Sequence, residues 1–251
     1  MDFGKMYSEE DLFPRMITSC EARDYGFLFF SESNKDSFDS NHAVIFRDKV
    51  HDLKRVLADI IVFYKNKGIR PIIYQSIDEE GYFEEFKDVF SECGFECRTE
   101  EQKYMILTGE NAIIPNPKIA VGRVREWEDA FATEIFEKAG EPWETAVAKR
   151  ALKNKNTLFF AAYLNGQPVG MTYSHVSDGV CRVDYLLVSK EFRKIGVGRA
   201  LIHAFTEYCR ANKIENCFLW PDGESAEKIY YEAGFRHAAT KIAGRAAYIK
   251  D

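Results

Sequence analysis

The sequence lacks the features of membrane-spanning, secreted and nucleic-acid-binding proteins. No segment approaches the roughly 20 consecutive apolar residues that cross a bilayer. The acidic start, residues 1–11, has neither the basic nor the apolar region of a signal peptide. The net charge of -6 argues against a nucleic-acid partner, which a basic face would attract. These absences predict a cytoplasmic protein with no membrane partner and no nucleic-acid partner.

The six cysteines contain no C-x-x-C pair. Because zinc sites and disulfide frameworks usually show close, regular cysteine spacing, we expect neither a metal site nor a disulfide. We interpret the cysteines as reduced, mostly buried thiols. The composition, 46% apolar and 29% charged residues, indicates a packed globular protein.

Proline is also scarce, with seven residues in 251. Two of them lie in residues 111–117, Asn-Ala-Ile-Ile-Pro-Asn-Pro, where prolines and asparagines interrupt both helix and strand. This segment predicts a linker between an N-terminal domain, residues 1–110, and a C-terminal domain, residues 118–251.

The C-terminal domain is predicted to contain a three-stranded meander followed by alternating helices and strands. The hairpin signals Asn165-Gly166 and Asp178-Gly179 separate three β-rich runs. Ser225 is a candidate N-cap for a late helix that Gly234 ends. The periodicity predicts strands at 118–125, 157–164, 167–176, 180–188, 217–220, 236–242 and 246–250, and helices at 127–139, after Pro142, at 196–212 and at 225–233.

The N-terminal domain contains a fainter copy of this closing pattern. Residues 57–66 predict a helix, 71–74 a strand and 83–93 a second helix, and Gly94-Phe95 then matches Gly234-Phe235. This order indicates an internal repeat. A chance similarity between short α/β pieces is the alternative.

Residues 183–200 carry the clearest chemical signal, a strand that leads through a basic, glycine-containing turn directly into a helix. Free backbone N–H groups and the helix dipole suit such a helix start to a phosphate or pyrophosphate. Gly196 and Gly198 let a ligand approach the backbone, and Arg193, Lys194 and Arg199 add cationic donors. A P-loop is excluded because no Gly-Lys-Ser/Thr is present, and a dinucleotide fingerprint because its third glycine is missing.

The turn is similar to the acetyl-CoA loop of the Gcn5-related N-acetyltransferase (GNAT) superfamily, Q/R-x-x-G-x-G/A, with Arg193, Gly196 and Gly198 at its fixed positions. The second motif of that family, N-x-x-A-x-x-L-Y-x-x-x-G-F, resembles Gly223, Ala226, Ile229, Tyr230, Gly234 and Phe235. Glycine stands at the asparagine position, so that side chain's contact with the cofactor is not expected. The resemblance covers residues 118–251. It implies an α+β fold of the α/β type, a mixed sheet flanked by helices, in tandem with a degenerate N-terminal copy.

The resemblance also implies an enzyme, an N-acetyltransferase that uses acetyl-CoA and a primary amine of a small molecule or peptide. The neutral amine would attack the bound thioester directly in a ternary complex, and a backbone N–H near Leu187 or Val188 would stabilise the oxyanion. Tyr230 falls on the family's tyrosine that protonates the departing thiolate. Two alternatives stay open, a longer acyl-CoA donor and a catalytically weak CoA-binding regulatory protein. The implied cofactor-binding residues are Leu186, Leu187, Val188, Arg193, Lys194, Ile195, Gly196, Val197, Gly198, Arg199, Ala226 and Tyr230.

The sequence leaves the base that deprotonates the amine open. Asp184 lies two residues before Leu186 on the expected strand, so we expect it on the same face, where it would orient or deprotonate the amine. The alternative is a structural carboxylate paired with Arg182. Further options are His175, Glu144, Glu134 and a bound water.

The acceptor and the N-terminal half receive weaker predictions. Acidic residues near the first two helices of the C-terminal domain favour a cationic acceptor, with a solvated face as the alternative: Glu134, Glu137, Glu141 and Glu144. The N-terminal copy has no glycine in residues 48–54, and Phe90 stands opposite Tyr230 without a hydroxyl. We therefore expect the N-terminal half to shape the acceptor site without binding CoA. The oligomeric state is expected to be a monomer or a homodimer.

Overall fold

The computed structural model describes residues 2–250 and divides them into two compact units. The C-terminal unit comprises residues 2–6 and 103–239, and the N-terminal unit comprises residues 7–102 and 240–250. The predicted linker, residues 111–117, contains neither helix nor strand. The division into domains 1–110 and 118–251 stays a prediction.

The C-terminal unit contains a mixed sheet with the strand order β5-β10-β9-β8-β7-β6. β9 and β10 are parallel, whereas the other neighbours are antiparallel. The Asn165-Gly166 and Asp178-Gly179 turns have positive φ at both positions, as the predicted hairpins require. The strands are β5 (Phe95–Leu107), β6 (Ile119–Val124), β7 (Thr157–Leu164), β8 (Gln167–Ser177), β9 (Val180–Val188) and β10 (Cys217–Leu219).

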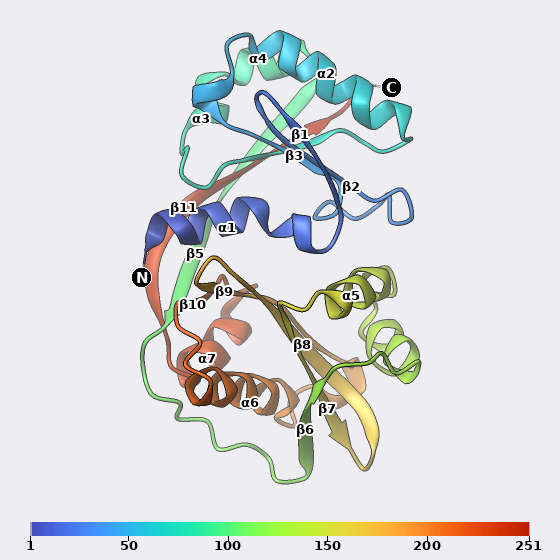
Figure 1. The fold of residues 1–251 in the computed structure, drawn as a ribbon, viewed down its shortest axis with the longest axis vertical. Helices are drawn as coiled ribbons and strands as arrows, with labels where there is room; N and C mark the ends of the chain where they lie inside the picture. Colours follow the sequence, from blue (N-terminus) through green and yellow to red (C-terminus); the bar gives the residue numbers. More distant parts are fainter. Residues whose placement is uncertain (1, 251) are drawn as a thin grey trace. The chain divides into compact units, whose positions relative to one another are not determined.

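Helices cover both faces of this sheet (Figure 1). On β7, Phe160 packs edge-on against Phe205 of α6 (Val197–Ala211), while Phe159 stacks on Phe131 beside the π-helical turn Ala132–Glu137. Adjacent strand residues point to opposite faces, so α6 and the π-helical turn lie on opposite sides. The remaining helices of the unit are α5 (Glu144–Lys153) and α7 (Glu224–Glu232). This arrangement confirms the predicted mixed sheet flanked by helices.

The N-terminal unit has its own core around α2 (Leu53–Asn66), whose N-cap Asp52 accepts a hydrogen bond from the Arg55 N–H. Its strand order is β1-β2-β3-β4-β11, with β3 and β4 parallel. The other elements are α1 (Phe3–Leu12), the 3-10 turns Phe13–Met16 and Arg47–Lys49, β1 (Ser19–Arg23), β2 (Gly26–Phe30), β3 (His42–Ile45), β4 (Ile72–Gln75), α3 (Tyr82–Glu85) and α4 (Lys87–Glu92). Among residues 2–250, every helix is too short or too polar to cross a membrane.

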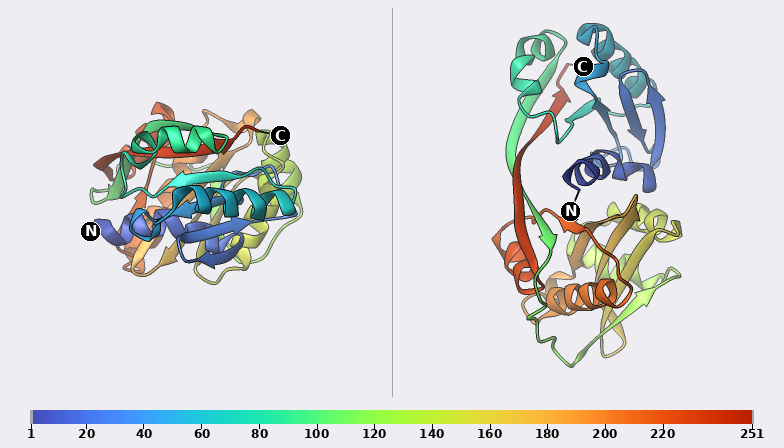
Figure 2. Two further views of the ribbon diagram at one scale, coloured as in Figure 1. Left: turned by 90° about the horizontal axis from the view of Figure 1, so that it is seen from above. Right: turned by 60° about the vertical axis from the view of Figure 1, so that its left-hand side comes forward.

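The two units repeat one order of elements and exchange their closing strands. In each, a parallel pair encloses a helix, β3-α2-β4 and β9-α6-β10, and further helices lead to a long strand. The first long strand, β5, pairs with β10, and the second, β11 (Phe235–Tyr248), pairs with β4. β5 and β11 run side by side in Figure 2 and are neighbours in the strand order. The repeat agrees with the predicted degenerate copy.

Three details differ from the sequence-based predictions. The two expected final strands form the single strand β11. Gly223, not Ser225, is the N-cap of α7, and its φ of 82° suits glycine. The expected helix at residues 83–93 is broken at Phe86 into α3 and α4.

Candidate active site

Strand β9 separates from β10 after a short pairing. Among the described residues, the parallel pairing involves Cys181 and Arg182 of β9, whereas the pairing with β8 continues to Val188. Residues 183–188 therefore extend beyond the last β10 pair on that side. The backbone N–H and C=O groups that point away from β8 can bind an extended ligand, as an exposed strand edge binds a peptide.

The N-terminus of α6 follows β9 and carries free backbone N–H groups. Its N-cap Gly196 has a φ of 99° and no capping side chain. The Ala200 N–H donates to the Gly196 carbonyl at 2.9 Å, so the N–H groups of residues 197–199 precede the first helical hydrogen bond. Together with the helix dipole, they form a site suited to an anion.

Gly198 lies where α6, α7 and β9 meet. A Cβ at this position would be 3.5 Å from Ile229 Cδ1, 3.8 Å from Leu186 Cδ2 and 4.0 Å from Val188 Cγ2. Gly198 therefore lies next to both the far end of β9 and the second motif on α7. Ala226, which also packs on this core, lies one turn before Tyr230 on the same helix.

The cationic side chains near the turn differ in availability. The Arg193 Nε donates to the Val188 carbonyl at 3.1 Å and so closes the turn onto β9. Arg199 donates two hydrogen bonds, of 2.7 and 2.9 Å, to the Glu232 carboxylate on α7. Its guanidinium is therefore engaged within the chain. At this position the backbone N–H is the group that remains free to donate a hydrogen bond to a phosphate. Lys194 adopts a φ of 64°.

Asn116, in the predicted linker, braces the same turn. Its Nδ2 donates to the Ile195 carbonyl at 3.0 Å, and its Oδ1 accepts from the Lys118 N–H at 3.1 Å. The Ile195 carbonyl and the Gly196 N–H belong to one trans peptide and point in opposite directions. Asn116 therefore fixes the direction in which the Gly196 N–H points, a role that the sequence motif did not reveal.

Tyr230 is buried on α7, with 7% of its surface exposed, and packs edge-on against Phe235 at a centroid distance of 5.9 Å. Burial, together with the negative charge of Asp222, raises the pKa of Tyr230 above its usual value. The hydroxyl therefore keeps its proton at neutral pH, as a proton donor must.

Asp184 does not share the face of Leu186, so this expectation was wrong. The β8–β9 register pairs Tyr173 with Tyr185 and Ser174 with Val183, which leaves Asp184 as the extra residue of a β-bulge. Tyr185 stacks on Tyr173 at 5.8 Å, so both lie on the face opposite α6, whereas Leu186 packs toward α6. The bulge reverses the alternation and puts Asp184 on the Tyr185 side.

Asp184 forms the ion pair with Arg182 that was the alternative expectation, and His175 Nε2 lies 3.5 Å from its Oδ2. Burial alone would raise the pKa of Asp184, but the charges of Arg182 and His175 outweigh it and lower the pKa to about 2. A carboxylate with such a low pKa is a weak proton acceptor. Its catalytic role stays a prediction.

The other predicted bases have contacts typical of structural residues. His175 is fully buried, and its Nδ1 lies 3.1 Å from Thr157 Oγ1. Glu134 accepts a 2.6 Å hydrogen bond from Lys138 Nζ, and Glu144 is 3% exposed.

Glu141 is the carboxylate that the structure brings to β9. The Tyr185 hydroxyl donates to its Oε2. Burial raises the pKa of Glu141, and the nearby Arg193 opposes this rise. The sequence indicated Glu141 only as part of an acidic cluster, because its contact with Tyr185 depends on the bulge at Asp184.

Comparisons with known proteins agree with this geometry. Residues 127–245 match the family model described as an acetyltransferase (GNAT) domain. No curated protein sequence matches the chain. A GCN5-related N-acetyltransferase from Kribbella flavida is similar in structure, with a TM-score of 0.70, 13% identity, and coverage of 98% of this chain and 95% of that one.

Two further solved structures share the fold. A conserved protein of unknown function from Staphylococcus epidermidis has a TM-score of 0.62 and 17% identity, over 97% of this chain and 100% of its own. A tandem GNAT protein from the clavulanic acid biosynthesis pathway has a TM-score of 0.58 and 10% identity, over 84% of this chain and 76% of its own. At these identities the likeness establishes the fold alone.

Proposed function

Because this chain carries a GNAT acetyltransferase domain at residues 127–245, we propose that it transfers an acetyl group from acetyl-CoA to a primary amine of a small molecule or peptide. The observation that carries the proposal is the glycine-capped start of α6 next to the point where β9 leaves β10. One end of this region suits a pyrophosphate, and the other suits an extended amide-containing chain.

In this proposal, acetyl-CoA lies along residues 183–188 with its pyrophosphate at the start of α6. The backbone groups of Leu186 and Val188 bind the pantetheine arm, and the N–H groups of residues 196–199 bind the phosphates. Gly198 supports this placement, because a side chain there would enter the space between Ile229 and β9. Arg193 and Lys194 flank the turn and add positive charge.

The amine must lose a proton before it attacks the thioester. An alkyl ammonium with a pKa near 10.4 is neutral less than about once in a thousand at pH 7. Glu141 is the better proton acceptor, since its pKa is raised, whereas Asp184 is held at a low pKa. Of the two roles predicted for Asp184, we therefore favour orienting the amine over deprotonating it. Asp184 contacts Arg182 and Tyr173, which hold it in place.

The attack produces an oxyanion and then a thiolate, and each needs a donor. A backbone N–H near Leu187 or Val188 would stabilise the oxyanion. Tyr230, whose hydroxyl is protonated at neutral pH, would protonate the departing CoA thiolate. No covalent enzyme intermediate is required.

A cationic acceptor and a cytoplasmic location complete the proposal. Glu141 would attract an ammonium group, while Glu134 is occupied by Lys138. All six cysteines are unpaired, as expected in a reducing compartment. We also propose that the N-terminal unit binds no CoA.

The test is thiol release from acetyl-CoA in the presence of a panel of polyamines, amino acids and short peptides, followed with a chromogenic thiol reagent. Propionyl-CoA and hexanoyl-CoA define the donor. Tyr230→Phe tests the proton donor, and Tyr231→Phe, on the exposed side of the same helix, is the matched control. Absence of amine-dependent thiol release across the panel, in protein that binds CoA, would contradict transferase activity and favour a regulatory protein.

A further inference from the structure

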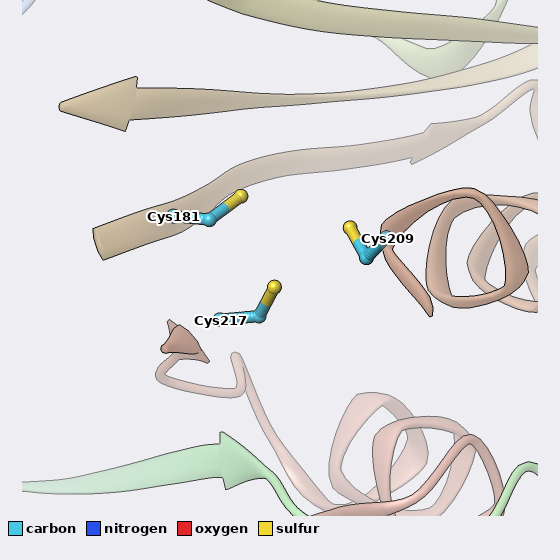
Figure 3. A group of neighbouring side chains, drawn as sticks. All are labelled: Cys181, Cys209 and Cys217. Atoms are coloured by element: carbon cyan, nitrogen blue, oxygen red, sulfur yellow. The ribbon is translucent and has the colours of Figure 1, made fainter. Parts of the chain in front are cut away.

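Three cysteines from three different elements bring their sulfur atoms together in the core of the C-terminal unit. Cys181 lies near the start of β9, Cys209 in the last turn of α6 and Cys217 at the start of β10, and all three are buried. Their Sγ atoms lie within 4.8 Å of one another. Figure 3 shows the sulfurs directed toward a common space. The sequence predicted no metal site, because these cysteines are far apart along the chain.

The backbone holds this cluster in place at the paired end of β9 and β10. Cys181 and Cys217 are partners in the parallel pairing. Ile214, in the connection from α6 to β10, donates its N–H to the Cys209 carbonyl at 2.9 Å and accepts from the Cys217 thiol at 3.6 Å. The connection, residues 212–216, is mostly exposed, so its local opening provides a route to the sulfurs.

The cluster offers a metal ion three sulfur donors. Among residues 2–250, the group of neighbouring metal-binding side chains contains the three cysteines alone.

We propose that Cys181, Cys209 and Cys217 form a three-coordinate site for one Cu(I) ion. Soft sulfur ligands select Cu(I) and zinc, but zinc in structural sites takes four ligands, one more than this cluster provides. With a metal–sulfur distance of about 2.3 Å, as in zinc–thiolate bonds, three sulfurs in a plane around an ion lie about 4.0 Å apart, within the observed limit of 4.8 Å.

Sulfur coordinates Cu(I) as thiolate, so binding of the ion releases the protons of the coordinating thiols. The bound ion would connect the end of α6 to β9 and β10, and would therefore stabilise the C-terminal unit against unfolding.

The experiment uses the full chain with the other three cysteines replaced, C20S/C93S/C97S, so that only the cluster sulfurs remain. The reduced, metal-free protein is titrated without oxygen with Cu(I) in competition with a coloured Cu(I) chelator. We expect one Cu(I) per chain and a higher melting temperature. Replacement of Cys209 by Ala or Ser should lower the affinity by at least about 100-fold, the upper end of the effect of losing a supporting residue.

X-ray absorption at the copper edge gives a second readout that needs no cluster variant. Three sulfur neighbours at about 2.3 Å are expected. Binding of fewer than about 0.1 Cu(I) per chain would overturn the proposal. So would unchanged Cu(I) affinity in the folded Cys209 variants, or an absorption spectrum with fewer than three sulfur neighbours. One Zn²⁺ per chain that Cu(I) cannot displace would overturn the assignment of the ion. None of these measurements depends on acetyltransferase activity.

Discussion

Replacement of Gly198 by alanine should change stability and CoA affinity in opposite directions. The new Cβ would meet Ile229, Leu186 and Val188 at 3.5 to 4.0 Å, which is ordinary van der Waals contact. The free protein therefore has room for the methyl group. The same methyl group would occupy the space through which the proposed pyrophosphate approaches the start of α6.

The two effects can be estimated separately. Alanine in place of glycine in a helix stabilises by about 0.5–1 kcal/mol, which raises the melting temperature of a chain of this size by roughly 1–4 °C. Loss of one hydrogen bond to a charged phosphate costs about 1.5–3 kcal/mol, or roughly 10- to 150-fold in affinity. G198A should therefore melt at a higher temperature and bind CoA more weakly.

Thermal unfolding without ligand and calorimetric titration with CoA measure both effects on one variant. Gly122→Ala is the matched control, because a Cβ at Gly122, on β6, has no atom within 4 Å. The control should keep the parent affinity. An affinity of G198A within about twofold of the parent would refute the placement of the pyrophosphate, and destabilisation of the free protein would refute our interpretation of the local packing.

Three further predictions test the site. Tyr230→Phe should lower kcat by about 10- to 100-fold, with little change in CoA affinity, and a kcat equal to that of Tyr231→Phe would contradict a proton-donor role. The pKa of Asp184, lowered from about 3.9 to about 2, contributes about 2–3 kcal/mol of stability that is present above pH 4 and lost as the pH falls toward 2. In Asp184→Asn, the free energy of unfolding measured with urea should therefore depend less on pH over this range. The variant should also be less stable than the parent at pH 7, because Arg182 is left unpaired. An unchanged pH dependence would contradict the role of the ion pair. Asn116→Ala should raise the KM for acetyl-CoA about 2- to 12-fold at unchanged kcat, and equal loss of kcat would argue against a role in positioning the turn.

The sequence predicted those parts of the fold that depend on neighbouring residues. Hairpin dipeptides and alternating apolar residues located β7, β8 and β9, and helical periodicity located α6. The anion-binding turn was recognisable because Gly196 and Gly198 are needed at fixed spacing. The closing strand was misjudged as two segments, because β11 runs from one unit into the other and its pairing partners lie far away in the sequence.

The chemistry of the site was harder to predict, because it depends on one extra residue. Strict alternation puts Asp184 beside Leu186, but the β-bulge moves it next to His175 and Arg182. Bulges leave no clear mark in a single sequence. The same holds for the contact between Glu141 and Tyr185, which needs the bulge on β9 and the loop before α5 together.

The strand pair β9 and β10 unites the two inferences because its two ends differ. At the paired end, Cys181 and Cys217 are partners and Cys209 of α6 packs against them. At the open end, residues 183–188 have lost β10 as a neighbour and face the start of the same helix. A helix fixed to the strands at its C-terminus can hold its N-terminal N–H groups at a constant distance from the open strand. Bound as proposed, Cu(I) would connect the helix to the strands at the end where the strands meet, whereas the glycines leave room at the end where the cofactor would enter.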